Sequence, residues 1–321
     1  MNYMKNRYIK VIPLVVFALF FLPALTRAAG YDFFVDKNSA EAIEDGTEAR
    51  PFKTIGAAML HIQTEKLKRK TVYIKKGTYA ESINISGDTK LIGESEDETI
   101  IDADGFQNAA NLISTKSEIR NLTIKNSEAT AVIVDKKSKV TIDNCNIEEA
   151  GKYAVDVKQS SATNKYKFII KNSEVSGSGL QGLYIYKRKI SISGNEIFDN
   201  NGEGIDLHPG NKGTISGNNI HANSESGIES ILSSGTSLTF KNNYVENNHA
   251  QGITVQVYST SKKGKVKISS NTIRGNDNYG IRYANYTQSI GPKKFKIFAD
   301  KYIKLSKNTI KDNDKGDIAY E

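Results

Sequence analysis

The chain has 321 residues, a formal net charge of +8 and 25% charged residues. Its single cysteine, Cys145, excludes an internal disulfide framework, and no Cys/His cluster has the spacing of a zinc site. No basic run is interleaved with aromatic residues, so we expect no nucleic-acid partner.

Residues 1–28 have the three parts of a secretory signal peptide. "MNYMKNRYIK" is positively charged, "VIPLVVFALFFLPAL" is apolar, and "TRAAG" offers small residues for cleavage after Ala28. The apolar run is shorter than the ~20 residues of a membrane span, and no later segment comes close. These residues carry four basic side chains and no acid, which leaves about +4 on the remaining chain. We therefore expect a secreted, periplasmic or extracellular monomer without a membrane span.

Residues 29–70 are expected to hold a first strand and a capping helix. Within "TIGAAMLHIQTEKLKRK", Ile55, Ala58, Met59 and Ile62 recur at helical spacing. Such a helix would cover the open end of a stack of strands. His61 lies on this segment, and we expect it at the surface of the helix.

Residues 71–321 are built on a repeat of ~23 residues. Three copies are "ISISGNEIFDNNGEGIDL" (190–207), "GTISGNNIHANSESGIES" (213–230) and "LTFKNNYVENNHAQGITV" (238–255). Each copy alternates short apolar strands with Asn/Gly turns and cannot bury its apolar face alone, so successive coils must stack. A period of this length suits a three-sided coil of parallel strands.

Two columns of asparagine align these copies. A stacked amide can donate to the coil on one side and accept from the other. Cys145 falls in the first column in an earlier repeat, so we expect a buried thiol. The first column is Asn195, Asn218, Asn243, Asn271 and Asn308, and the second is Asn200, Asn223, Asn248, Asn276 and Asn313.

The first coils carry a family resemblance. "DGTEARPFKTIGAAM", "VYIKKGTYAESINI" and "LIGESEDETIIDADG" resemble the opening of the pectate-lyase-like superfamily of secreted proteins. The resemblance implies an all-β, right-handed, single-stranded parallel β-helix (a solenoid) with an N-terminal helical cap. It also implies a carbohydrate-active class that includes polysaccharide lyases, epimerases and hydrolases, and members without a known reaction.

The Gly-Ile-x-Val strand of each coil places its Ile and Val inward, so the alternate positions point outward. The strands line up these positions on one exposed face. The first outward column is Asp156, Tyr184, Asp206, Glu229, Thr254 and Arg282, and the second is Lys158, Tyr186, His208, Ile231, Gln256 and Ala284.

This set of side chains fits chemistry on a uronic acid polymer. His208 could remove the proton beside the sugar carboxylate, and Tyr184 or Tyr186 could act as the acid. Asp206 and Glu229 could orient His208 or hold Ca²⁺. Asp156, Lys158, Gln256 and Arg282 are the candidate substrate-binding residues. We therefore predict an acidic polysaccharide as the partner, and lyase or C5-epimerase action on it.

The motif at residues 206–208 resembles that of bacterial mannuronan C5-epimerases, which carry Asp-Pro-His-acid on such a strand. Asp206 and His208 keep the spacing, while Leu207 and Pro209 stand in place of the proline and the acid. Glu203 stands where that family has a tyrosine.

Two other functions fit the same face. A glycoside hydrolase could use Asp206 and Glu229, since adjoining coils would hold them about 5 Å apart, near the retaining separation. A non-catalytic protein could bind extracellular polysaccharide there without a reaction. The remaining segment, "ANYTQSIGPKKFKIFADKYIK" (284–304), breaks the repeat, and we expect it to cap the last coil.

Overall fold

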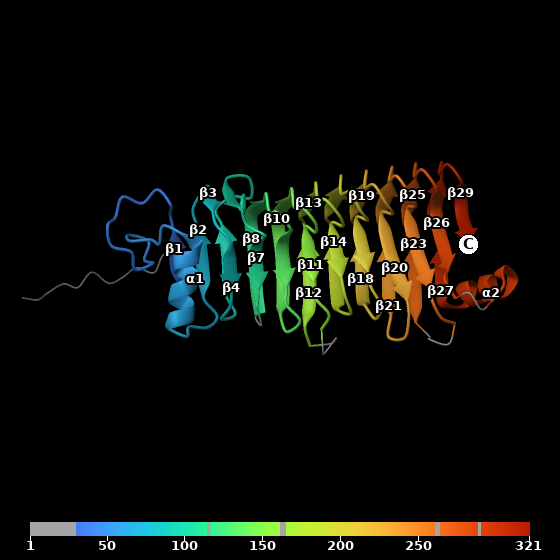
Figure 1. Cartoon of the computed structure of the whole chain (residues 1–321), viewed down its shortest axis with the longest axis horizontal. Helices are drawn as coiled ribbons and strands as arrows, with labels where there is room; N and C mark the ends of the chain where they lie inside the picture. The colour runs from blue at the N-terminus through green and yellow to red at the C-terminus, as the bar shows by residue number, and fades with distance from the viewer. Residues whose placement is uncertain (1–29, 114–115, 161–164, 261–263, 288–289) are drawn as a thin grey trace, which may run out of the picture.

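The structure is a computed structural model that describes residues 30–113, 116–160, 165–260, 264–287 and 290–321. The predicted signal peptide lies outside these residues. Figure 1 shows a long stack of coils that runs from the N-terminal to the C-terminal end, with one helix at each end. No helix in the described part of the chain is both long enough and apolar enough to cross a membrane.

Each full coil contributes strands to three faces, and every strand pairs in parallel with its counterparts on neighbouring coils. The first face holds β1 (Phe33–Val35), β2 (Thr71–Ile74), β5 (Lys90–Gly93), β8 (Lys116–Lys125), β10 (Lys139–Glu148), β12 (Lys167–Lys171), β15 (Lys189–Ser193), β18 (Lys212–Ser216), β21 (Ser237–Lys241), β24 (Lys265–Ser269) and β27 (Ile303–Ser306). The second face takes the C-terminal halves of β8 and β10, with β3 (Gly77–Ala80), β6 (Thr99–Asp102), β13 (Glu174–Ser176), β16 (Glu196–Phe198), β19 (Asn219–His221), β22 (Tyr244–Glu246), β25 (Thr272–Arg274) and β28 (Thr309–Lys311).

The third face is a separate sheet of ten strands, one from each coil, and it carries the predicted site. Because the strands are parallel and in register, equivalent residues of successive coils lie ~4.8 Å apart. Its strands are β4 (Ile83–Ile85), β7 (Asn108–Leu112), β9 (Thr130–Val134), β11 (Val155–Val157), β14 (Leu183–Ile185), β17 (Ile205–Leu207), β20 (Ile228–Leu232), β23 (Ile253–Val257), β26 (Tyr279–Asn285) and β29 (Gly316–Tyr320).

The core consists of inward columns of aliphatic side chains. On the third face, Val155, Leu183, Ile205, Ile228 and Ile253 pair in register, and all are fully buried. Branched aliphatic residues suit this position because they pack well on a pleated surface. The alternation in the sequence therefore predicts correctly which side chains point inward.

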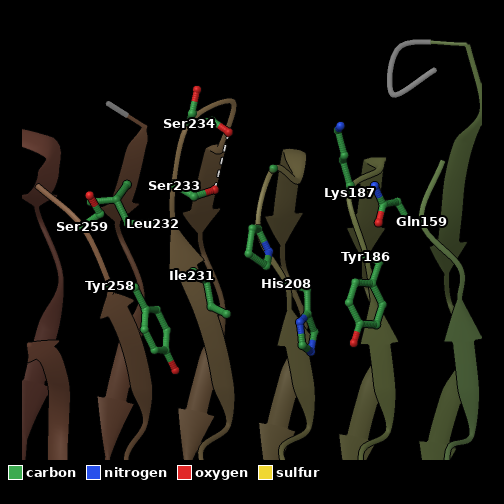
Figure 2. A pocket seen from close by; sticks show the side chains of 12 residues that line it. Gln159, Tyr186, Lys187, His208, Ile231, Leu232, Ser233, Ser234, Tyr258 and Ser259 are labelled. Carbon is green, nitrogen blue, oxygen red and sulfur yellow. Dashed lines mark hydrogen bonds between the residues drawn. The ribbon is translucent and has the colours of Figure 1, made fainter. Parts of the chain in front are cut away.

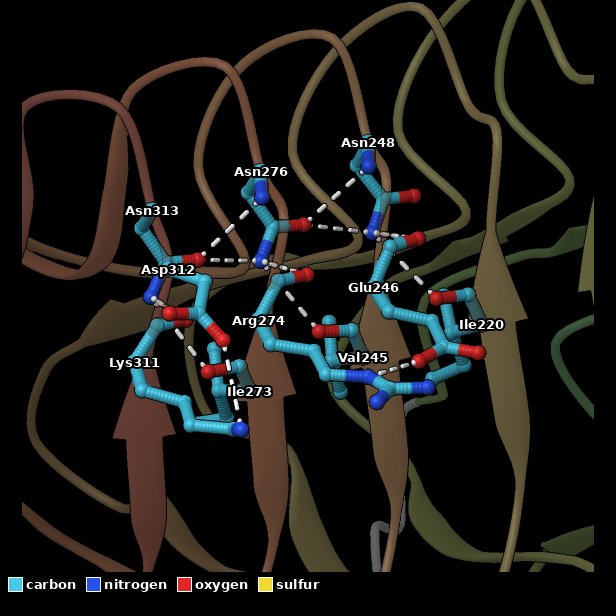
Figure 3. A network of polar contacts seen from close by, with 10 residues as sticks. All are labelled: Ile220, Val245, Glu246, Asn248, Ile273, Arg274, Asn276, Lys311, Asp312 and Asn313. Atoms are coloured by element: carbon cyan, nitrogen blue, oxygen red, sulfur yellow. Dashed lines mark hydrogen bonds and ion pairs between the residues drawn. The ribbon is translucent and has the colours of Figure 1, made fainter.

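Two asparagine ladders fix one coil to the next, as predicted. Asn248 Nδ2 donates to Asn276 Oδ1 at 3.0 Å, and Asn276 Nδ2 donates to Asn313 Oδ1 at 2.8 Å (Figure 3). The same amide of Asn248 donates backward to the carbonyl of Ile220 at 3.2 Å. Each amide thus binds coils on both sides, so the ladder satisfies polar groups that the turns bury.

Cys145 lies in line with the first ladder and is fully buried, which confirms the prediction of a buried thiol. Its backbone N–H donates to Ser173 Oγ at 3.2 Å, and the Ser173 N–H donates to Asn195 Oδ1 at 3.1 Å. Burial raises the pKa of the thiol to about 12. A thiol in this environment is inert.

A helix covers the N-terminal end of the stack, as predicted. α1 (Ile55–Thr64) begins after Thr54, whose hydroxyl accepts a hydrogen bond from the N–H of Ala57 at 3.0 Å. It buries the apolar face given by the sequence spacing, against β1 and β4. His61 differs from the expectation, because it is half-buried and packs against the rings of both Phe33 and Phe52.

A second helix lies at the C-terminal end. α2 (Pro292–Tyr302) falls in the segment that breaks the repeat, and it buries Phe295 and Ala299. It packs against β27 and β29 of the last coil (Figure 1). The segment therefore caps the solenoid, as predicted.

Candidate functional site

The strands of the third face bring the first outward column together. Asp156 pairs with Tyr184, Tyr184 with Asp206, and Asp206 with Glu229 on consecutive strands β11, β14, β17 and β20. Although these side chains point away from the core, they are not fully exposed to solvent. Asp206, for example, is only 7% exposed, because neighbouring side chains cover it. The site is thus a half-buried cluster on a rigid sheet.

His208 and Asp206 form the central pair. His208 Nε2 lies 3.3 Å from Asp206 Oδ2, and the two side chains point the same way because they lie two residues apart. A carboxylate in this position favours the tautomer with its proton on Nε2. Nδ1 is then the nitrogen that can accept a proton from a substrate.

Two tyrosines on the preceding coil contact the imidazole of His208. The ring of Tyr186 stacks on the imidazole of His208 with centroids 4.0 Å apart, and Tyr184 meets that imidazole edge-on at 4.8 Å. The hydroxyls of Tyr184 and Tyr186 share a hydrogen bond of 2.7 Å. Burial, followed by the bond to Tyr186, raises the pKa of Tyr184, so the Tyr184 hydroxyl keeps its proton at neutral pH.

A third ring, Tyr153, stacks on Tyr184 at 4.5 Å with nearly parallel planes. Burial raises the pKa of Tyr153 as well, and the charge of Asp156 adds to it. Tyr153 occupies the position before the Gly of the repeat, where Ala154 replaces the Gly. The outward columns did not include it, although the position before the Gly could have revealed it.

Two carboxyl groups beside the pair are perturbed by burial. Burial, and then the charge of Asp206, raise the pKa of Glu229 to about 7. Burial, and then a hydrogen bond with Glu225, raise the pKa of Glu203 to about 8. Gln181 donates to Glu203 at 2.8 Å. Below these pH values the site therefore holds neutral carboxyl groups that can donate hydrogen bonds.

The candidate substrate-binding residues divide into near and far groups. Gln256 lies one coil beyond Glu229, to which it hydrogen-bonds. Lys158 forms an ion pair with Asp156, two coils before Asp206. Arg282 lies three coils beyond Asp206, ~14 Å along the axis, where it pairs with Glu321 at 3.0 Å. The structure thus does not bring Arg282 to the cluster around His208.

Arg188 supports this part of the face from within. Its side chain is fully buried and donates to the carbonyl oxygens of Lys158 at 2.9 Å and Ser138 at 2.9 Å, and also to that of Asp135. These contacts connect the turn after Tyr186 to two earlier coils. Arg188 therefore stabilises the strand ends that carry the site.

A cleft of about 550 Å³ opens beside His208. Figure 2 shows the His208 and Tyr186 rings on one side of it, the Tyr258 ring on the other, and Ile231 between them. Tyr258 lies outside the predicted columns, two residues beyond Gln256. The lining residues are Gln159, Tyr186, Lys187, His208, Pro209, Gly210, Ile231, Leu232, Ser233, Ser234, Tyr258 and Ser259.

Cation binding was predicted at Asp206 and Glu229. Among the residues that the structure describes, no group of three or more His, Cys, Asp or Glu side chains is arranged to hold a metal ion. Ca²⁺ at these two carboxyl groups stays a prediction. Two histidines on other parts of the solenoid have carboxylate partners: His221 lies 3.0 Å from Glu196, and His249 lies 3.0 Å from Asp277.

The family model of a right handed beta helix region matches residues 107–255 and 161–297, which together span more than half of the chain. The chain belongs to this family. The fold is therefore the right-handed parallel β-helix that the sequence predicts. A comparison with curated proteins gives no match.

Solved structures share the fold at low sequence identity. The A-module of a mannuronan C-5 epimerase from Azotobacter vinelandii is 17% identical with a TM-score of 0.56, over 82% of this chain and 92% of that one. An alginate lyase from a Paenibacillus species is 12% identical with a TM-score of 0.58, over 83% and 96%. The Dettilon tailspike protein is 17% identical with a TM-score of 0.58, over 77% of this chain and 52% of its own. At these identities the likeness extends to the fold alone.

Proposed function

We propose that this protein is an exported enzyme that cleaves an acidic, uronate-containing polysaccharide by β-elimination at the third face. The observation that carries the proposal is the His208–Asp206 pair stacked on Tyr186, with the Tyr184 hydroxyl bonded to that of Tyr186. Two structural neighbours, a mannuronan epimerase and an alginate lyase, act on such polymers, which supports the choice of substrate class.

The proposed step uses one base and one acid. His208 Nδ1 takes the proton from C5 of the uronate, and the electron pair of that bond forms the C4–C5 double bond. The C4–O bond breaks, and a tyrosine hydroxyl of the Tyr184–Tyr186 pair gives its proton to the leaving oxygen. The proton on His208 then returns to the tyrosine, directly or through water.

Elimination suits the site better than epimerisation. His208 and the tyrosines come from one sheet face and reach the sugar from one side. Such an arrangement suits a uronate whose C5 hydrogen and C4 oxygen lie on the same side of the ring. Epimerisation at C5 needs a proton donor on the opposite side. C5-epimerase action is therefore the alternative reaction, and isotope labelling in D₂O distinguishes it from elimination.

The carboxyl groups of the site would at first repel an anionic sugar. Glu229, with its pKa near 7, is largely protonated in mildly acidic solution and can donate a hydrogen bond to the uronate carboxylate. Such a contact reduces the charge on that carboxylate, which makes the neighbouring C5 proton more acidic. Lys158 and Gln256 are the other groups on this face that could neutralise it.

The experiment offers alginate, pectate and glycosaminoglycans to the purified protein in D₂O, with and without Ca²⁺. Elimination gives an unsaturated product that absorbs ultraviolet light, and epimerisation gives deuterium at C5 without it. His208→Ala should abolish either product. His221→Ala is the matched control, since His221 lies on the second face beside Glu196. Binding without any product would support the non-catalytic alternative and overturn the proposal.

A glycoside hydrolase is the second candidate function, and one observation favours it. Asp206 and Glu229 pair on adjoining strands, ~5 Å apart, and the pKa of Glu229 is raised to about 7. A retaining glycosidase needs two carboxyl groups at about this separation, one of them protonated. Hydrolysis would release reducing ends without ultraviolet absorbance, and Glu229→Gln would abolish it.

A further inference from the structure

Two aromatic stacks on the third face leave a gap of one coil. Tyr186 and His208 stack at 4.0 Å with planes 22° apart, and Tyr258 and Tyr286 stack at 4.9 Å with planes 16° apart. The two rings of each pair come from neighbouring coils, so the rings stack along the long axis of the solenoid and their planes lie roughly perpendicular to it. The coil between the stacks presents Ile231 (Figure 2).

The gap has the width of one sugar ring. His208 and Tyr258 belong to coils two apart, which are ~10 Å apart along the axis. A ring in van der Waals contact with both faces needs ~3.5–4 Å on each side. One ring therefore fits between the two faces, and two do not.

The position of Tyr258 is fixed by a hydrogen bond. Its hydroxyl donates to Gln256 Oε1 at 3.0 Å, which turns the side chain back along its own strand. In Figure 2 the Tyr258 ring lies at the level of the His208 ring, with Ile231 between them. Tyr258 is 53% exposed, with one face against Tyr286 and the other toward the cleft.

The charge of the cleft differs from that of the cluster beside it. Among the lining residues that the structure describes, Lys187 is the cation and none is an Asp or a Glu. The acids Asp206 and Glu229 do not line the cleft. A ring with apolar faces and an anionic substituent thus matches the aromatic walls, the aliphatic floor and the positive rim.

We infer that the slot between His208 and Tyr258 is a subsite for a single uronic acid ring, next to the sugar that reacts. The slot holds that ring with its two faces against His208 and Tyr258 and its edge over Ile231. For the identity of the sugar, this inference rests on the proposed function. The sugar in the slot contacts the ring face of His208, so the reacting sugar lies toward the edge of the imidazole. The subsite therefore positions the polymer and has no part in the proton transfers.

The test measures binding of uronate oligosaccharides of two to six residues, and of a neutral gluco-oligosaccharide, by isothermal titration calorimetry. Tyr258→Ala should weaken uronate binding about tenfold, the size expected for one aromatic face. Ile231→Phe fills the floor of the slot and should weaken binding as much. Tyr286→Ala is the control, since it leaves both the Tyr258 ring and its hydrogen bond to Gln256 in place, and it should stay within about threefold of the wild type.

The outcomes separate this inference from the proposed function. Equal affinity of the wild type, Tyr258→Ala and Ile231→Phe overturns the subsite, while elimination by the wild type would leave the proposed reaction standing. Tyr258-dependent binding of the neutral oligosaccharide alone overturns the assignment to uronate and the proposed substrate, but retains a sugar slot. No binding of any of these oligosaccharides overturns both. Thermal unfolding of each variant checks that it is folded.

Discussion

His208 Nε2 lies 3.3 Å from Asp206 Oδ2, while one face of the same imidazole stacks on the Tyr186 ring. The carboxylate sets the tautomer and the tyrosine sets the plane of the ring. His208 is therefore held in one orientation before the substrate binds, which is the condition for efficient proton transfer from a positioned base.

Asp206→Asn should test the role of Asp206 in supporting His208 without disturbing the fold. The amide cannot stabilise the imidazolium that forms when His208 takes a proton, so we expect kcat to fall about 100-fold with little change in KM. The check is steady-state kinetics on the polymer that the wild type cleaves. Unfolding curves should stay close to wild type, because Asn keeps the shape of Asp. Unchanged kcat would exclude a role for this pair.

Activity should fall as pH rises through about 7. Burial and the charge of Asp206 raise the pKa of Glu229 to about 7, so its proton, which would bond the uronate carboxylate, is lost above that pH. Glu229→Gln keeps a donor at every pH and should remove this decline, with activity retained above pH 8. The check is the pH profile of kcat/KM for both proteins. If Glu229→Gln abolishes cleavage at all pH values, Glu229 acts as the acid and the hydrolase is favoured.

Glu203 should make stability depend on pH. Its pKa is raised from 4.5 to about 8 in the folded state, mainly by burial, so between these values the unfolded chain is ionised and the folded chain is protonated. Its contribution is complete below pH 4.5 and is lost as pH rises to 8. Glu203→Gln should therefore leave the free energy of unfolding unchanged at pH 4 and raise it by about 4 kcal/mol at pH 8.

The exposed Glu48→Gln is the matched control for this change and should have no effect at either pH. Urea unfolding at the two pH values measures both variants. A stabilisation by Glu203→Gln that is equal at pH 4 and pH 8 would contradict the assignment of a protonated Glu203.

Two neighbouring asparagines test the ladder. Asn200 is fully buried, and its Nδ2 donates to Asn223 Oδ1 at 2.9 Å, whereas the next residue, Asn201, is exposed. Asn200→Ala leaves buried partners on two coils unsatisfied and should cost about 3 kcal/mol. Asn201→Ala should change the unfolding free energy by less than about 0.5 kcal/mol. Equal effects of the two substitutions in denaturant titrations would show that the ladder adds little to stability.

Arg188 should be a structural requirement of the site. Arg188→Met removes the guanidinium hydrogen bonds to the carbonyl oxygens of Asp135, Ser138 and Lys158, and we expect a loss of about 3–5 kcal/mol. The loss of stability can be measured from the melting temperature and from the rate of proteolysis at the turns. The exposed neighbour gives the control, since Lys187→Met should leave the melting temperature unchanged. A stable Arg188→Met variant would mean that the buried cation is not needed there.

The amino-acid sequence alone determined the solenoid, its two ladders and the outward columns. The asparagine columns fix how coils align, and the two-residue alternation of a strand fixes which side chains point outward. These two patterns are enough to group Asp206, His208, Tyr184 and Glu229 on one face. The same register placed Arg282 three coils beyond Asp206 on this face, but it could not show that Glu321 pairs with Arg282.

The tertiary structure alone decided the electrostatics and the shape of the site. The pKa values of Glu229 and Glu203 depend on how deeply neighbouring coils bury them, which a linear pattern does not contain. The slot between His208 and Tyr258 depends on side-chain rotamers and on the hydrogen bond of Tyr258 to Gln256. Strand register places the backbone of each residue, whereas desolvation and ring stacking depend on contacts between side chains of different coils, which form only when the chain is folded.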